Sequence, residues 1–529
     1  MGLSPWISLD EFLYLVFQTL VPMRLPSAAI VILIFIVTGC KKPGEPSTTI
    51  DTDTNSWWAT TTELSSDAME GRDTGSPGYA RAAAIVAERL AAAGLQPLGD
   101  NGTWFQDVAM EETAITQATI TVGDRALRFL LDIYAAPNSV SESIDAPLVY
   151  GGYCDSTTLS SVKNKLVICH GTSREGLPGN ADRMRILTKA GAFGIITIAD
   201  PGFTVEPPRW PFAYSRRVVL AGTPNVKSAL LNFRLNADAL DKLIEGSGQN
   251  AKELIDLGSQ GKPLPSFEVP DHLKARFTTT QRTINSPNVI GKLAGTDPDR
   301  ANEAIVLTAH LDGYGYGEAV QGDSLYNGTL DDAAYVALLI QLVERQKGKG
   351  FRRPLILAIV TGEEKGLLGS QYLVQHLPVP KESLIANINL DQLRPLFPLE
   401  LLTVHALDET TLGDDARAVA LSMNIKVQND PEPERNLLMR SDHWNFIQAG
   451  IPAINFVFGF QPGSESERIY RQWYREGYHT PKDDLQQKMD WGAATKFNTF
   501  FYGLVEKVAN GEVAPAWKPG SKLRPITNK

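Results

Sequence analysis

Three short stretches decide the fold of this 529-residue chain: AIVLTAHLD at residues 304–312, LILAIVTGEE at residues 355–364 and LIANINLD at residues 384–391. Each begins with the apolar run of a buried strand, and residues 332–346 and 366–376 between them have helical spacing. Buried strands that alternate with helices predict an α/β fold with a mostly parallel central sheet flanked by helices.

Histidine or carboxylate side chains follow each of these strands. His310 lies near the end of the first stretch, Glu363 and Glu364 end the second, and Asp391 ends the third. Because sites in such sheets lie at the carboxyl ends of the strands, we expect these side chains to converge. With Asp331, which precedes a predicted helix, they form a mostly carboxylate set that suits zinc or a similar divalent ion.

Two metal ions are expected at this edge. The candidate ligands exceed the three protein groups that a catalytic zinc requires, and a bridging carboxylate can hold two ions about 3.5–4 Å apart. Glu363 and Glu364 are adjacent and should point in different directions. One of them can therefore bind metal while the other acts as a base.

These motifs resemble those of the M28 metallopeptidases, the zinc aminopeptidases and their relatives, over roughly residues 57–510. The resemblance is carried by AHLD (309–312), NGTLDD (327–332), TGEEKGLLGS (361–370), NLD (389–391) and YHTP (478–481). It implies two zinc ions, with Asp331 as the bridging ligand. The zinc ligands that it implies are His310, Asp331, Glu364, Asp391 and His479.

The resemblance also implies roles around the metals. Glu363 would be the general base, and Asp312 would orient His310. Arg440, in the segment RSDH (440–443), and Tyr478 would hold the substrate and its developing oxyanion.

The sequence departs from the family pattern at two positions that bear on substrate preference. Tyr335 stands where small residues are usual, and Gln392 stands where relatives often carry methionine.

Other polar residues are expected to be structural. Asp332 should cap a helix. His443 is not needed, because the ligand set is complete without it. The remaining histidines lack a partner pattern and should be surface or packing residues: His170, His272, His376 and His405.

The amino terminus has the layout of an export signal. Residues 23–40 read MRLPSAAIVILIFIVTGC, which is too short for a comfortable membrane span. VTGC (37–40) resembles the bacterial lipobox, which implies a lipidated Cys40 and an exported protein anchored to the cell envelope. A plain signal peptide or an anchor helix are the alternatives. The leader is expected over residues 1–40, with the start at Met23, followed by a linker over residues 41–56.

The rest of the chain is predicted to form a catalytic domain with an insertion. The catalytic domain takes residues 57–145 and 278–512, and a tail follows over residues 513–529. Residues 146–277 form a small β-rich insertion. It resembles the protease-associated domain through VYGGYC (149–154) and AGAFGIITI (190–198).

Cysteine usage leaves one question open. If Cys40 carries lipid, Cys154 and Cys169 remain. They form either a disulfide, as an exported protein allows, or two buried thiols.

Composition and motifs together predict an enzyme that acts on peptides. A formal net charge of -10 argues against nucleic acid as a partner. We expect a two-zinc exopeptidase, with an aminopeptidase favoured over a carboxypeptidase or dipeptidase on the same site. A glutaminyl cyclase, which uses one zinc, and a non-catalytic binding module are disfavoured by the intact ligand set. The oligomeric state is not predicted.

Overall fold

The computed structural model describes residues 51–156, 161–172, 174–202, 210–224, 228–392 and 394–525. The expected leader with Cys40 lies outside the described residues, as does most of the expected linker. No helix in the described part of the chain combines the length and the apolar character that crossing a membrane requires.

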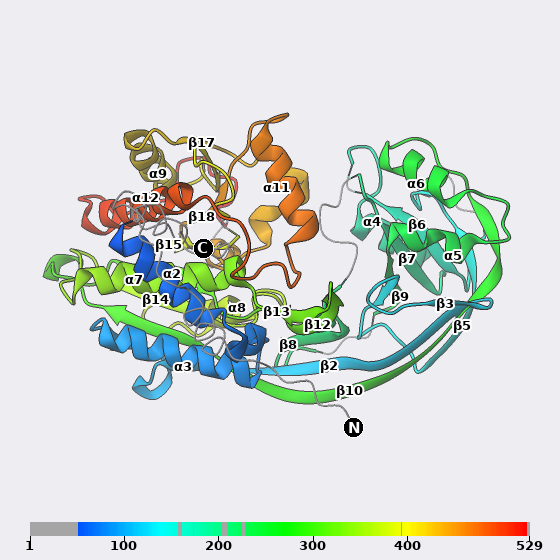
Figure 1. Ribbon diagram of the computed structural model, residues 1–529, viewed down its shortest axis with the longest axis horizontal. Helices are drawn as coiled ribbons and strands as arrows, with labels where there is room; N and C mark the ends of the chain where they lie inside the picture. Colours follow the sequence, from blue (N-terminus) through cyan, green and yellow to red (C-terminus); the bar gives the residue numbers. More distant parts are fainter. Residues whose placement is uncertain are drawn as a thin grey trace, which may run out of the picture. The chain divides into compact units, whose positions relative to one another are not determined.

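Four parallel strands form the centre of the main sheet, in the order β18-β15-β11-β14. They are β11 (Ala304–His310), β14 (Leu355–Val360), β15 (Leu384–Asn389) and β18 (Ala453–Phe458). Figure 1 labels β14, β15 and β18 among them. Antiparallel strands flank them: β10 (Phe267–Leu293) beside β14, and β16 (Leu401–His405) beside β18. β17 (Lys426–Gln428) pairs in parallel with β16. This arrangement confirms the predicted α/β class.

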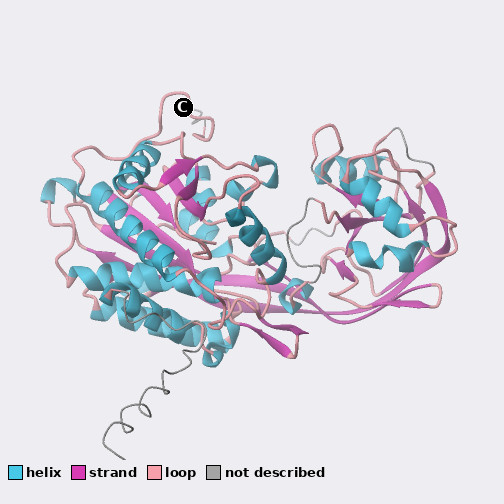
Figure 2. Cartoon of the chain, turned by 45° about the horizontal axis from the view of Figure 1, so that its top comes forward, coloured by secondary structure: helices cyan, strands magenta, loops and turns pink. Residues whose placement is uncertain are grey.

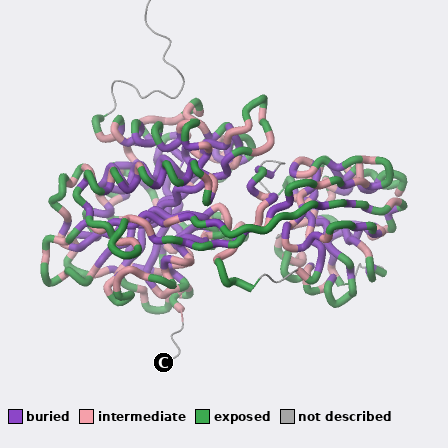
Figure 3. The backbone as a smooth tube through the Cα atoms, turned by 90° about the horizontal axis from the view of Figure 1, so that it is seen from below, coloured by how far each residue is buried: buried purple, intermediate pink, exposed green. Residues whose placement is uncertain are grey.

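Helices cover both faces of this sheet (Figure 2). Side chains such as Leu307 and Leu357 face one core, and Val306 and Ile356 face the other, because successive strand residues alternate. The first core is covered by α2 (Thr52–Leu64), α3 (Pro77–Ala92), α7 (Ala334–Gln346), α9 (Thr411–Ser422), α11 (Glu465–Glu476) and α12 (Trp491–Asn510). The second is covered by α8 (Leu368–Gln375) and α10 (His443–Gln448). The central strands are buried along their length except at Ile385, which is partly buried (Figure 3).

A third core, in the inserted part, surrounds another group of parallel strands. These strands run in the order β5-β6-β7-β9. Their bounds are β5 (Ser143–Tyr150), β6 (Leu166–Gly171), β7 (Gly194–Ala199) and β9 (Leu231–Leu235), with α4 (Asn180–Lys189), α5 (Leu240–Ile244) and α6 (Ala251–Ser259). The shorter strands are β3 (Arg125–Leu127), β4 (Ile133–Ala135) and β8 (Arg216–Leu220). The inserted part is thus itself mixed α/β rather than only β-rich.

Two long strands change the expected domain boundaries. β2 (Phe105–Val122) pairs antiparallel with β10 along its whole length, and both strands contribute to the first and the third core. The third core already includes Ile115, so the predicted boundary at residue 146 is too late. Because hydrogen bonding continues along both strands, the sequence shows no break in composition that would mark the boundary.

The amino-terminal boundary also differs from the prediction. Helix α2 begins at Thr52, where Asp51 accepts a hydrogen bond from the Thr54 amide. The linker therefore ends before residue 56. The helix is held in place by Trp57, whose ring nitrogen donates to the Ala334 carbonyl at 2.6 Å.

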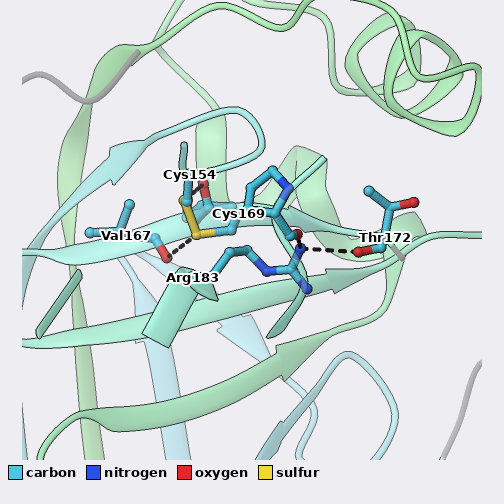
Figure 4. The surroundings of a disulfide bond; sticks show 7 residues. Cys154, Val167, Cys169, Thr172 and Arg183 are labelled. Carbon is cyan, nitrogen blue, oxygen red and sulfur yellow. Dashed lines mark hydrogen bonds between the residues drawn. A yellow bond between two sulfur atoms is a disulfide. The ribbon is translucent and has the colours of Figure 1, made fainter. Parts of the chain in front are cut away.

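Cys154 and Cys169 form a disulfide in the inserted part (Figure 4). Both are fully buried, within a small apolar cluster that includes Val149 and Ile195. Near it, the Arg183 guanidinium donates to the Thr172 carbonyl at 3.1 Å. The structure thus decides between the two alternatives that the sequence left open. A disulfide agrees with an oxidising compartment, although export itself stays a prediction.

Reduction of this disulfide should destabilise the inserted part. The two cysteines are 15 residues apart in the sequence. A disulfide that closes a loop of this size restricts the unfolded chain and so raises the free energy of unfolding by about 3 kcal/mol. The free energy of unfolding of the wild type, measured by chemical denaturation with and without a reductant, should therefore differ by about 3 kcal/mol. The variant with Cys154→Ala and Cys169→Ala should be less stable and should not respond to the reductant. Equal stability of oxidised and reduced wild type would contradict this expectation.

Candidate metal centre

The carboxyl ends of the central strands lie in register. His310 pairs with Val360, and Thr308 pairs with Asn389, so β11, β14 and β15 end at the same edge. Gly362, with a φ of 65°, turns the chain after β14 toward Glu363. The predicted convergence of the three strand ends is confirmed.

Asp331 is delivered by a separate loop before α7. The Asp483 carboxylate accepts from the amides of Leu330 and Asp331 at 2.9 and 3.0 Å. Arg72, which is fully buried, donates to the Leu311 carbonyl and to the Asn327 carbonyl, each at 2.7 Å. Arg72 thereby ties the end of β11 to the segment before Asp331.

The five predicted ligands gather in two groups that share Asp331. His310, Asp331 and Asp391 form one group, and Asp331, Glu364 and His479 form the other. The two oxygens of Asp331 face different histidines. Its Oδ1 lies 3.2 Å from His310 Nε2, and its Oδ2 lies 3.5 Å from His479 Nε2.

The spacing of these atoms fits tetrahedral zinc. Two ligand atoms at 2.0–2.2 Å from one tetrahedral ion lie about 3.3–3.6 Å apart. His310 Nε2 lies 3.7 Å from Asp391 Oδ1, and His479 Nε2 lies 3.6 Å from Glu364 Oε2. Both oxygens of Asp391, one of Glu364 and one of Asp331 are buried without a hydrogen-bond partner among the described residues. A bound cation would satisfy these atoms.

Asp312 fixes the loop that carries the two glutamates. Its carboxylate accepts from the amides of Glu363 and Glu364 at 3.1 and 3.3 Å, and from the Thr74 hydroxyl at 3.0 Å. Nδ1 of His310 lies 3.0 Å from the Asp312 backbone carbonyl and 3.8 Å from its carboxylate. Asp312 thus positions the glutamates as well as lying beside the histidine.

Glu363 belongs with His310 and Glu364 to a third group of possible ligand atoms. Burial, with the charges of Asp391 and Glu364, raises the pKa of Glu363 well above its ordinary value, against the opposing effect of His310. A raised pKa suits a group that must accept and return a proton near neutral pH.

Asp332 does not cap helix α7, contrary to the prediction. The helix is preceded by Ala333, without a side-chain cap. Asp332 is fully buried and its Oδ2 accepts from the His310 amide at 3.2 Å. It therefore supports the metal centre, because the preceding turn directs its side chain toward β11 rather than back to the helix.

The two predicted substrate-binding residues lie in different surroundings. Tyr478 is buried and its ring stacks on His479, and Gln392 donates to the Tyr478 hydroxyl at 3.1 Å. Gln392 thus supports Tyr478. Arg440 is exposed at the end of the short turn Leu437–Met439, and its role at the site stays a prediction.

Tyr335 and the remaining histidines have structural positions. Tyr335 is buried in the core, where its ring meets Phe497 edge to face. His405 and His443 stack on each other inside the protein, as packing residues do. His170 is also buried. His272 and His376 are exposed.

Three residues at the centre were not found from the sequence, namely Arg72, Tyr314 and Asp483. Arg394 also lies there. The Tyr314 hydroxyl lies 3.1 Å from His479 Nδ1, and an Arg394 nitrogen lies 3.8 Å from Asp331 Oδ2. Asp483 follows His479 by four residues and Tyr314 follows His310 by four residues, which are sequence signals that could have pointed to these two residues.

Charge at the centre favours a cation. Eight buried carboxylates gather there: Asp312, Asp331, Asp332, Glu363, Glu364, Asp391, Asp442 and Asp483. Burial and the charge of Asp331 raise the pKa of Asp483 to about 6. Buried carboxylates in such excess are stabilised by metal ions.

Parts of the chain are similar in sequence to known proteins. Residues 288–505 match the profile of peptidase family M28. A "Probable zinc metalloprotease" of Pyrenophora teres is 27% identical over 245 residues, which is 44% of this chain and 50% of the relative. The alkaline phosphatase isozyme conversion protein of Escherichia coli is 29% identical over 194 residues, covering 34% of this chain and 56% of the relative. The chain thus spans about half the length of the curated relatives that it matches.

Solved structures show the same fold over most of the chain. An aminopeptidase from Aneurinibacillus sp. strain AM-1 superposes with a TM-score of 0.59 at 19% identity, covering 88% of this chain and 96% of that structure. A zinc aminopeptidase from Bacillus subtilis gives a TM-score of 0.58 at 17% identity, with coverage of 87% and 96%. Residues 288–505 of this chain are thus similar to peptidase family M28, and its fold is similar to that of these solved structures.

Proposed function

We propose that the protein is a two-zinc aminopeptidase, which hydrolyses the first peptide bond of substrates with a free amino terminus. The observation that carries this proposal is the position of Asp331, whose two oxygens each face a different histidine. His310 and Asp391 would complete one site, and His479 and Glu364 the other.

Two zinc ions would supply an activated water and polarise the scissile carbonyl. Glu363 would take the proton from the attacking water and pass it to the leaving amine. Its position on the loop fixed by Asp312 keeps the carboxylate beside both groups of ligands. Tyr478, held by Gln392, would donate a hydrogen bond to the oxyanion.

The excess of carboxylates favours a free amine in the substrate. A protonated amine gains from the negative charge around Glu363 and Asp391, whereas a terminal carboxylate needs a cationic partner. Arg394, the buried arginine nearest the bridge, is already enclosed by the rings of Trp473, Tyr474 and Tyr478. It is therefore poorly placed to clamp a carboxylate at the metals. The names of the structural neighbours support the same direction of cleavage.

Blocked substrates test the direction of cleavage. Zinc-loaded protein should hydrolyse leucine p-nitroanilide with a free amino group and should leave N-acetyl-leucine p-nitroanilide intact, because acetylation removes the charge that the site binds. Release of p-nitroaniline followed by absorbance measures both rates. Equal rates would contradict an aminopeptidase, and cleavage of N-acetylated peptides from the carboxyl end would establish the alternative.

A further inference from the structure

A small pocket opens beside Glu364, where residues of the inserted part approach the metal centre. Its volume is about 150 Å³, which is enough for a group the size of benzene. Tyr134, Tyr214 and Tyr314 form aromatic walls, and Lys365 and Arg217 also line it. Tyr214 and Tyr314 stack with their ring planes 7° apart, so the wall combines one ring from each part of the chain.

Most of the charges around this pocket are already paired. Arg216 binds the carboxylates of Asp73 and Glu112. Lys365 lies 3.3 Å from Asp73, and Arg282 lies 2.7 Å from Glu112. Three cations therefore share two carboxylates, which leaves the network with a positive excess before Arg217 is counted.

Arg217 follows Arg216 on strand β8 and lines the same pocket, but it makes none of the ion pairs of this network. Arg217 is half-buried, and within the described ranges no carboxylate lies at ion-pair distance from it. A planar guanidinium in a partly buried aromatic pocket is well suited to hold a carboxylate through two hydrogen bonds.

We propose that this pocket binds a carboxylate of the substrate through Arg217. The inference rests on the proposed peptidase function and names its substrate class. Because the pocket is lined by the metal ligand Glu364, the carboxylate must belong to a residue next to the cleaved bond. In an aminopeptidase it is the side chain of an amino-terminal aspartate or glutamate. In a carboxypeptidase it would be the terminal carboxylate.

Variants at residue 217 test this proposal with a panel of p-nitroanilides. The wild type should have a higher kcat/KM for glutamate p-nitroanilide than for lysine p-nitroanilide. Arg217→Gln should lower kcat/KM for the glutamate substrate by about 10- to 100-fold, the loss of one charge-assisted contact, and change the leucine substrate far less. Arg217→Lys should restore part of the loss, and Arg217→Glu should favour the lysine substrate.

Arg276→Gln is the matched control, because Arg276 lies exposed on β10 in the inserted part and loses the same charge. It should behave as the wild type. N-acetyl-alanyl-leucine and its carboxyl amide identify the source of the carboxylate. If the acid alone is cleaved and Arg217→Gln abolishes this, the pocket holds the chain terminus.

Failure of the proposal is distinct from failure of the proposed function. A wild type that cleaves leucine p-nitroanilide but does not distinguish glutamate from lysine, with Arg217→Gln unchanged, overturns the pocket alone. If the zinc-loaded wild type cleaves no peptide or amide, the proposed function fails. Calorimetric titration with L-glutamate and L-norvaline then still tests the pocket. Tighter binding of glutamate that Arg217→Gln removes would support it, and equal affinities would overturn it.

Discussion

Replacing Glu363 by glutamine should abolish most of the turnover and leave the bound metal unchanged. An amide cannot accept the proton of the attacking water, and loss of a general base typically costs about 10²–10⁴-fold in rate. The substitution keeps the size of the side chain and leaves the backbone contacts of the loop to Asp312 intact. Steady-state kinetics together with the metal content of the purified variant measure both effects.

Glu364→Gln is the matched control, since it makes the same chemical change one residue along the chain. Glu364 Oε2 lies 3.6 Å from His479 Nε2, so this variant should lose the metal of the His479 group. An unchanged metal content in Glu364→Gln, with metal lost from Glu363→Gln, would show that the two roles are exchanged.

Replacing Asp331 by alanine should remove both metals and all measurable activity. It is the one residue common to the two ligand groups, and its carboxylate supplies one oxygen to each. With Asp331 absent, each group keeps one histidine and one carboxylate, fewer than the three protein ligands of a catalytic zinc.

Single-group variants provide the comparison for Asp331→Ala. Asp391→Asn should weaken only the His310 group, and Glu364→Gln only the His479 group. Each should retain about one metal per chain, measured by mass spectrometry of the native protein. Loss of a single metal from Asp331→Ala would mean that the carboxylate does not bridge.

The central sheet and the ligands that follow its strands could be predicted because each ligand comes shortly after the apolar run that forms its strand. The apolar run before His310 and the run before Glu363 each set a strand end, and parallel strands in register bring those ends together. The contacts that hold Asp331 could not be predicted in this way. Asp483 is 152 residues from Asp331, and Arg72 is 239 residues from Leu311.

The inserted part shows a different limit of sequence reasoning. Its boundaries fall inside β2 and β10, whose hydrogen bonding continues from one core to the other. Tyr214 and Arg217 approach the metal centre only through the folded position of β8 and the turn before it. No spacing along the chain connects these residues with Glu364.

The central claim is that Asp331 bridges two zinc ions, and anomalous diffraction at the zinc absorption edge tests it most directly. Crystals of the zinc-loaded protein should show two peaks per chain. One should lie among His310, Asp331 and Asp391, and the other among Asp331, Glu364 and His479. A single peak, or two peaks that do not share Asp331, would contradict the claim.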